Sequence, residues 1–188
     1  MAWPRSNKTQ SPDVDAAYEA AQTGVRSHHA VADFLRAGQT LAEIDRFIAK
    51  TIADLGAKSC FFGYRVPRTP PFPSHACLSV NSCVVHGHAA YHTAAITQGA
   101  LLKIDIGVTK RGWIGDAAWT YAIGEPSPQD AKLMECGKEC LKRGIAAMQP
   151  GNQLLEWAKT VQHCSDTEYG FHMVKHLGGH GYNTKLHA

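Results

Sequence analysis

The spacing of apolar residues predicts two helices in the first third of the chain. An Ala-rich segment from Asp13 to Leu35, with Gly38 just beyond it, is typical of a helix. The sequence Thr40 to Glu43 then has the reciprocal pattern of a capping box, which favours a helix start. The apolar residues that follow share one helical face until Gly56: Leu41, Ile44, Ile48, Ile52 and Leu55.

The middle of the chain has the pattern of strands. Residues 60–85 mix aromatic and β-branched residues around a Pro-rich break, which predicts short strands joined by an irregular loop. Residues 101–109 and 113–123 are better strand candidates. The short segment Lys110 to Gly112 between them indicates a β-hairpin.

Two more helices are predicted in the last third. Ser127 and Pro128 favour a helix start, and Pro150 closes that helix. Asn152 is the predicted N-cap of a further helix that ends near Cys164. Residues 170–188 are rich in His and Gly and have no pattern of a closing element. The succession of helices, strands and helices predicts an α+β fold with a hint of two similar halves.

Composition limits the classes of protein. The 188 residues are 44% hydrophobic, so we expect one domain over residues 13–188 behind a flexible tail at 1–12. The formal net charge is only +3, without Lys or Arg clusters, which disfavours a nucleic-acid partner. The tail lacks an apolar stretch, so we expect no membrane partner and a cytoplasmic protein whose six cysteines are reduced.

Asp105 and Asp116 are the first candidates for chemistry, because the hairpin brings them together. A two-residue turn at Lys110 and Arg111 makes the two aspartates direct cross-strand neighbours, and a turn at Arg111 and Gly112 makes them diagonal neighbours. Both turns place the two carboxylates on one face of the sheet. Such carboxylates are suited to binding hard cations, whereas the alternative is that one or both point into solvent at a strand end.

Histidines supply further candidate ligands. Glycines bracket His180 on both sides and allow backbone or ligand to approach it closely, although a simple loop histidine is the alternative. His86 is the first residue of a His-Gly-His sequence. The other histidines, including His28 in the first predicted helix, are interpreted as ordinary polar residues.

Four motifs in order resemble those of the methionine aminopeptidase family. They are Ser79-Val80-Asn81 through Val85-His86-Gly87, then Ile104-Asp105-Ile106-Gly107, then Gly115-Asp116, then Gly179-His180-Gly181 followed by His187. The second predicted helix, the strand pair and the helix entry at Pro150-Gly151-Asn152 also fall where the family has them, so the resemblance covers nearly all of the chain after the tail. The chain departs from the family at Ser82, Val85 and Tyr182-Asn183, which alters the predicted pocket walls more than the chemistry.

The resemblance implies the pita-bread fold, an antiparallel sheet with helices on its outer face, and a peptidase with two divalent metal ions. By that match Asp105, Asp116 and His180 bind metal, and His86 and His187 contact the scissile amide and transfer protons. The implied substrates are peptide or nascent-chain N-termini that begin with Met, and the implied state is a monomer. Carboxylate-rich ligands suit Co, Mn, Fe or Zn.

The same match implies that part of the family's site is missing from this sequence. The family's two glutamate ligands and the strands that carry them lie beyond the position of Ala188. We therefore expect a domain whose C-terminal strands are absent, from a fragment of an active enzyme. The alternatives are a noncatalytic pita-bread binding protein, an inactive fragment, or a related peptidase of the Xaa-Pro type.

Overall fold

A computed structural model describes residues 13–188, so the predicted tail at 1–12 lies outside the described residues. Within that range the chain forms an α+β structure, which confirms the predicted class. Its elements are α1 (Val14–Phe34), α2 (Leu41–Asp54), β1 (Lys58–Ser59), β2 (Cys77–Val80), β3 (Leu101–Lys110), β4 (Trp113–Ala122), α3 (Pro128–Ala147), α4 (Leu154–Gln162) and the π-helical turn η1 (His163–Glu168).

The sheet is antiparallel and β3 is its central strand. The short strands β1 and β2 pair with successive parts of one edge of β3, and β4 pairs with the other edge along its whole length. The prediction of short strands between residues 60 and 85 is confirmed for β2, whereas β1 lies just before that segment.

The β3–β4 hairpin turns at Arg111 and Gly112. Lys110 pairs with Trp113, and the two turn residues have φ angles of 51° and 80°, as a tight hairpin turn with positive φ requires. Asp105 consequently pairs with Ala118, and Asp116 pairs with Gly107. Of the two predicted registers, the diagonal one is confirmed and the directly opposed one is wrong.

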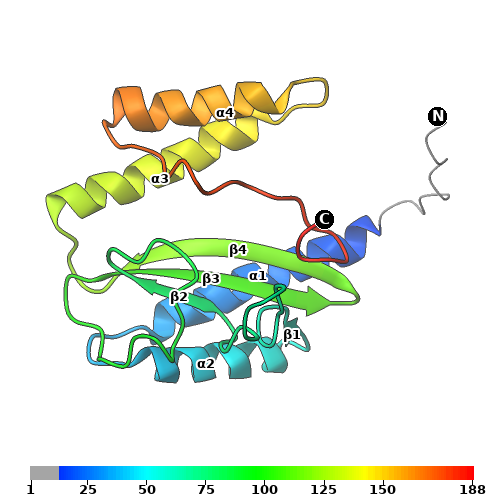
Figure 1. The fold of residues 1–188 in the computed structure, drawn as a ribbon, viewed down its shortest axis with the longest axis vertical. Coiled ribbons are helices and arrows are strands. Elements are labelled where there is room, and N and C mark those ends of the chain that lie inside the picture. The colour runs from blue at the N-terminus through cyan, green and yellow to red at the C-terminus, as the bar shows by residue number, and fades with distance from the viewer. Residues whose placement is uncertain (1–12) are drawn as a thin grey trace.

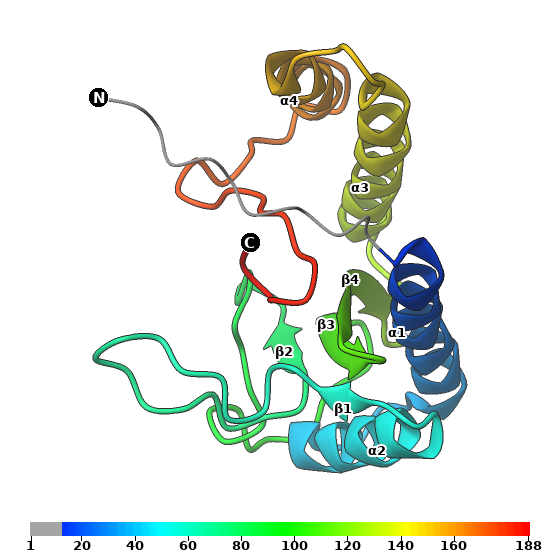
Figure 2. The ribbon, with the colours of Figure 1, turned by 90° about the vertical axis from the view of Figure 1, so that its right-hand side faces the viewer.

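The main core lies between the sheet and the first two helices. Ile44, Ile48 and Ile52 of α2 pack in one buried cluster with Ile104 and Ile106 of β3. Figure 2 shows α1 and α2 covering this face of the sheet, while the C-terminal segment lies on the other side. Side chains alternate between faces along a strand, so the residues between those core positions point away from the helices.

Side-chain caps explain where three helices begin. Asp13 accepts a hydrogen bond from the Ala16 N–H, and Ser127 accepts one from the Asp130 N–H. Thr40 and Glu43 form the predicted capping box in full. The predicted N-cap of α4 is wrong, because Gln153 occupies that position and the Asn152 amide donates instead to the Ala147 carbonyl.

The last two helices form a pair of their own. Figure 1 shows α3 and α4 side by side and apart from the sheet, and the segment after η1 returns from them to the sheet. Within residues 13–188, no helix is long and apolar enough to cross a membrane.

Candidate metal centre and active-site cavity

Asp105 and Asp116 lie on the face of the sheet that the two core helices leave open. Their neighbours Ile104 and Ile106 are fully buried against α2, so Asp105 projects to the opposite side. Asp116 is one pair further along the ladder, beside Gly107, and shares that face. The sequence therefore predicted the juxtaposition of the two carboxylates, and the structure fixes it as diagonal.

The two carboxylates are mutually unfavourable in the protein as it stands. Burial, and then the charge of Asp116, raise the pKa of Asp105 to about 7. Burial also raises the pKa of Asp116 above its ordinary value. The Oδ1 atom of Asp116 is buried and has no hydrogen-bond partner among the described residues. Such a buried acceptor costs about 1–3 kcal/mol unless something binds it.

Two histidines of the C-terminal segment face this pair. His180 Nε2 lies 3.9 Å from Asp116 Oδ2, and the rings of His180 and His187 are 4.4 Å apart. His187 Nδ1 and the Tyr64 hydroxyl share a 2.7 Å hydrogen bond, which fixes the ring orientation of His187. The Tyr64 contact spans most of the sequence, so no local pattern predicted it.

One cavity of about 750 Å³ brings all five predicted site residues together. Its polar lining includes Asp105, Asp116, His86, His88, His180 and His187, together with Tyr64 and Thr69. Apolar residues line the rest, among them Phe61, Val66, Pro70, Pro71, Phe72 and Leu186. The cavity is thus shaped for a ligand that has both a polar end and an apolar side chain.

The Pro-rich segment contributes an ordered wall of this cavity, which sequence reasoning left without a role. Its two ends are joined because the Gly63 N–H donates to the Phe72 carbonyl at 2.9 Å and the Phe72 N–H donates to the Tyr64 carbonyl at 2.8 Å. The Phe72 ring then packs edge to face against Phe61 and His88. These two backbone bonds hold the loop against the cavity.

Of the two close approaches predicted at the glycines around His180, by backbone or by ligand, the structure shows none by the described backbone. A Cβ atom built on Gly178, Gly179 or Gly181 would meet no protein atom within 4 Å. No described residue makes the close approach that these glycines allow, and the space beside them is free for a ligand.

The oxygen and nitrogen donors of Asp105, Asp116 and His180 suit a divalent cation, although they do not surround it completely. The imidazole of His180 faces Asp116, and the two half-buried carboxylates of Asp105 and Asp116 have no Lys or Arg partner among the described residues. A cation would offset their repulsion. Burial and the two carboxylates raise the pKa of the nearby Cys77 thiol to about 12, so this cysteine is neutral. Among residues 13–188, no three His, Cys, Asp or Glu side chains already converge as a set that could hold a metal ion.

Comparison with known proteins identifies the class to which this fold and site belong. The model of metallopeptidase family M24 matches residues 15–188, and the chain belongs to this family. The methionine aminopeptidase of Aquifex aeolicus is 31% identical over 176 residues, which are 93% of this chain and 67% of that protein.

Solved structures show the same fold. The methionine aminopeptidase of Thermotoga maritima superposes with a TM-score of 0.86 at 24% identity, over 97% of this chain and 71% of that one. The prolidase of Pyrococcus furiosus superposes with a TM-score of 0.76 at 20% identity, over 93% of this chain and 48% of that one. The predicted pita-bread fold is confirmed. The chain spans between 56% and 67% of the length of the first curated relatives that it matches.

Proposed function

We propose that this chain belongs to a metal-dependent aminopeptidase that removes the N-terminal methionine from peptides and nascent chains. The observation that carries the proposal is the diagonal Asp105–Asp116 pair in the cavity of about 750 Å³, where one buried carboxylate oxygen has no partner among residues 13–188. The relatedness to methionine aminopeptidases at about 31% identity supports it.

Asp105, Asp116 and His180 would hold the metal. Their oxygen and imidazole donors suit Co, Mn, Fe or Zn. Bound divalent ions supply a water molecule of lowered pKa and polarise the carbonyl of the first peptide bond. Two ions would need donors in addition to these three residues.

In this proposal His187 and His86 contact the substrate and assist proton transfer. In the tautomer with the proton on Nε2, the Tyr64 hydroxyl donates to His187 Nδ1 and leaves the Nε2–H free for the substrate. A donor held in this way stabilises the oxyanion of the tetrahedral intermediate. His86 lines the same cavity, and in this proposal it passes a proton to the leaving amine.

The apolar part of the cavity would receive the methionine side chain. Phe61, Phe72 and Leu186 belong to one small hydrophobic cluster beside the carboxylates. An unbranched thioether packs favourably against aromatic edges of this kind. The neutral Cys77 thiol in the same cluster adds no charge that would oppose an apolar side chain.

The test combines metal binding with release of methionine from Met-Ala-Ser. The 188-residue chain is titrated with MnCl₂ by calorimetry, and free methionine is quantified by chromatography. We expect Mn²⁺ binding that Asp116→Asn abolishes together with any hydrolysis. Asp33→Asn is the matched control, because Asp33 is exposed on α1, and it retains both properties. A chain that binds no Mn²⁺, or a D116N variant that binds it unchanged, contradicts the proposal.

The second candidate is a noncatalytic peptide-binding protein with the same fold. It is favoured by the small ligand set and by the lack, among the described residues, of a converged group of three donors. The same titration distinguishes the two functions, because a binding protein retains peptide affinity in EDTA and releases no methionine. A related peptidase of the Xaa-Pro type is distinguished by release of the first residue from Ala-Pro rather than from Met-Ala-Ser.

A further inference from the structure

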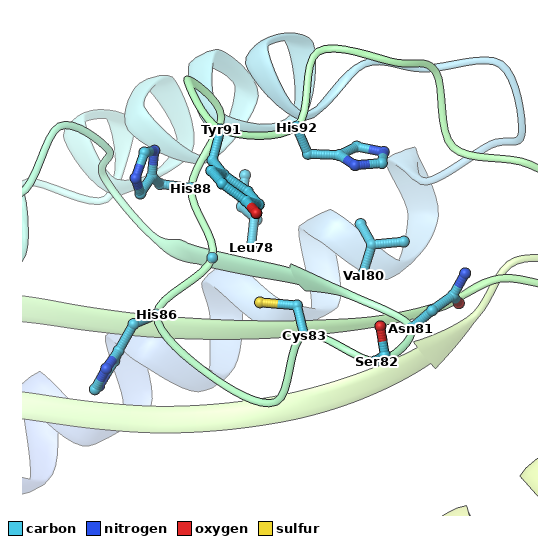
Figure 3. A pocket seen from close by; sticks show the side chains of 10 residues that line it. Leu78, Val80, Asn81, Ser82, Cys83, His86, His88, Tyr91 and His92 are labelled. Carbon is cyan, nitrogen blue, oxygen red and sulfur yellow. The ribbon is translucent and has the colours of Figure 1, made fainter.

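A second cavity of about 610 Å³ adjoins the cavity of the carboxylate pair. The two cavities share His86 and His88 as walls. The second is formed by residues 78–92, that is, by strand β2 and the loop that follows it (Figure 3). A ligand that extends from the first cavity past His86 and His88 therefore enters the second cavity, which has different lining residues.

The shared wall has a fixed backbone. The Leu78 N–H donates to the Gly87 carbonyl at 2.7 Å, and the Gly87 N–H donates to the Ser79 hydroxyl at 3.0 Å. A Cβ atom on Gly87 would lie 2.3 Å from the Leu78 carbonyl oxygen, so only glycine fits this close contact. Figure 3 shows His86 and His88 diverging on either side of this clamped segment. Both imidazoles are thus positioned by β2 and not by a free loop.

The second cavity has several side chains that can donate hydrogen bonds, beside apolar side chains such as Leu78 and Val80. Its polar lining residues are Asn81, Ser82, Cys83, His86, His88, Tyr91 and His92. Imidazole, amide and hydroxyl groups all donate, and an imidazole keeps at least one N–H in either protonation state. No Asp or Glu is among the described lining residues. Lys103 is not a lining residue, but its ammonium donates to the carbonyl of the lining residue Asn81 and places a positive charge next to that residue.

The two cavities therefore have opposite electrostatic character. The first contains Asp105 and Asp116, which attract positive charge, whereas the second presents N–H and O–H donors beside Lys103. A carboxylate is the peptide group that matches the second cavity, because it accepts several hydrogen bonds at once and is drawn to positive charge. A backbone amide carbonyl uses fewer of these donors.

We propose that the second cavity binds the free C-terminal carboxylate of a short peptide whose N-terminal residue occupies the first cavity. The assignment of the two peptide ends rests on the proposed aminopeptidase function. Three extended residues span about 10 Å, and the two cavities meet at His86 and His88, so a short extended peptide that passes these histidines enters both. Peptides of two or three residues are then preferred substrates, because only a short peptide brings its C-terminal carboxylate into the second cavity. The N-termini of long chains are bound without this contact.

The test compares Met-Ala-Ser with its C-terminal amide, which differs only in the carboxylate. Dissociation constants for the full 188-residue chain are measured by calorimetry, with and without MnCl₂. We expect the acid to bind about tenfold more tightly than the amide, which is the effect of one hydrogen bond to a charged group. Equal binding of the two peptides overturns the inference, while metal binding and methionine release would still support the proposed function.

A negative charge introduced into the second cavity tests whether the C-terminal carboxylate of the peptide binds there. His92 lines only the second cavity, so His92→Glu is expected to reverse the ratio until the amide binds more tightly than the acid. His172→Glu is the matched control, because His172 is exposed and lines neither cavity, and it retains the tenfold preference. If H92E retains that preference as well, the carboxylate binds elsewhere and the assignment is wrong.

A milder variant covers the case in which H92E does not fold, which circular dichroism reveals. His92→Leu removes the donors without adding charge, and it is expected to weaken binding of the acid about fivefold. An unchanged affinity of H92L for the acid overturns the assignment. A wild-type chain that binds neither peptide nor Mn²⁺ overturns both the subsite and the proposed function.

Discussion

His28 lies on the buried face of α1 and ties that helix to β4. Its ring stacks on Trp119 at 4.7 Å, and its Nε2–H donates to the Ala117 carbonyl at 2.8 Å. Its Nδ1 lies 2.9 Å from the Tyr121 hydroxyl, which donates to it in this tautomer. Burial lowers the pKa of His28 to about 4, so the imidazole is neutral in the folded protein at neutral pH.

This histidine makes the free energy of unfolding depend on pH. Between the folded pKa of about 4 and the ordinary value of 6.5, the unfolded chain binds the proton and the folded chain does not. The stabilisation is therefore complete above pH 6.5 and lost as the pH falls towards 4. We expect His28→Phe to remove about 3 kcal/mol of this pH dependence. Urea unfolding of the unaltered chain and of the variant at pH 4.5, 5.5 and 7.0 measures this pH dependence. If the free energy of unfolding changes equally with pH in both proteins, the expectation is wrong.

Asp105 is expected to destabilise the metal-free protein. Its raised pKa shows that the folded state disfavours the charged carboxylate beside Asp116. Asp105→Asn should therefore raise the free energy of unfolding in EDTA by about 1–3 kcal/mol. In MnCl₂ the wild-type chain should gain stability, and the variant should not. Thermal melts in both buffers measure the effect. A variant that is less stable in EDTA contradicts this account.

For individual residues, the sequence predicted those contacts that follow from the local geometry of a single hairpin. Either of the two possible two-residue turns places Asp105 and Asp116 on one face of the sheet, whereas a three-residue loop would not without a bulge. By contrast, the contacts of His28 with Tyr121 and of Tyr64 with His187 join residues far apart in the chain. No spacing pattern contains that information, so His28 was wrongly interpreted as an ordinary polar residue.

Among the helices, α2 agreed most closely with its prediction because three local signals coincide there. The capping box fixes its first turn, the apolar stripe fixes its buried face, and Gly56 follows its end with a φ of 67°. The predicted hairpin strands were also confirmed to within a residue at their ends. The segment between residues 60 and 76 was less predictable, since its shape depends on Phe72 packing against Phe61 rather than on periodicity.

The α2 cap provides a test at the element scale. The Thr40 hydroxyl accepts from the Glu43 N–H at 3.3 Å, and the Glu43 carboxylate accepts from the Thr40 N–H at 2.7 Å. Thr40→Ala removes one of these two bonds and should lower the free energy of unfolding by about 1 kcal/mol. Thr51→Ala, inside the same helix, is the control and should change stability by less than about 0.5 kcal/mol. Equal losses in both variants would show that the cap itself contributes nothing.

In the whole molecule, the helices divide into two groups that differ in burial. The first group, α1 and α2, packs on the sheet around the main core. In the second group, α3 packs against α4 and η1, and α4 has no buried residue. Large apolar side chains are exposed on this pair, including Leu141 at 66% and Leu154 at 73%. The second group therefore contributes less buried apolar surface per residue than the first.

This difference predicts two levels of protection from hydrogen exchange. Backbone amides of β3 and α2 should exchange only on global unfolding, whereas those of α3 and α4 should exchange earlier through local opening.

Trp157 provides the specific test, because its ring contacts α3 so closely that a Cβ on Gly144 would lie 2.7 Å from Trp157 Nε1. Trp157→Ala should speed exchange in α3 and α4 and leave β3 unchanged. Ile104→Ala, in the main core, should instead speed exchange in β3 and α2. Mass spectrometry of the exchanged peptides measures both variants, and uniform protection of all four elements in the wild-type chain contradicts the division into two groups.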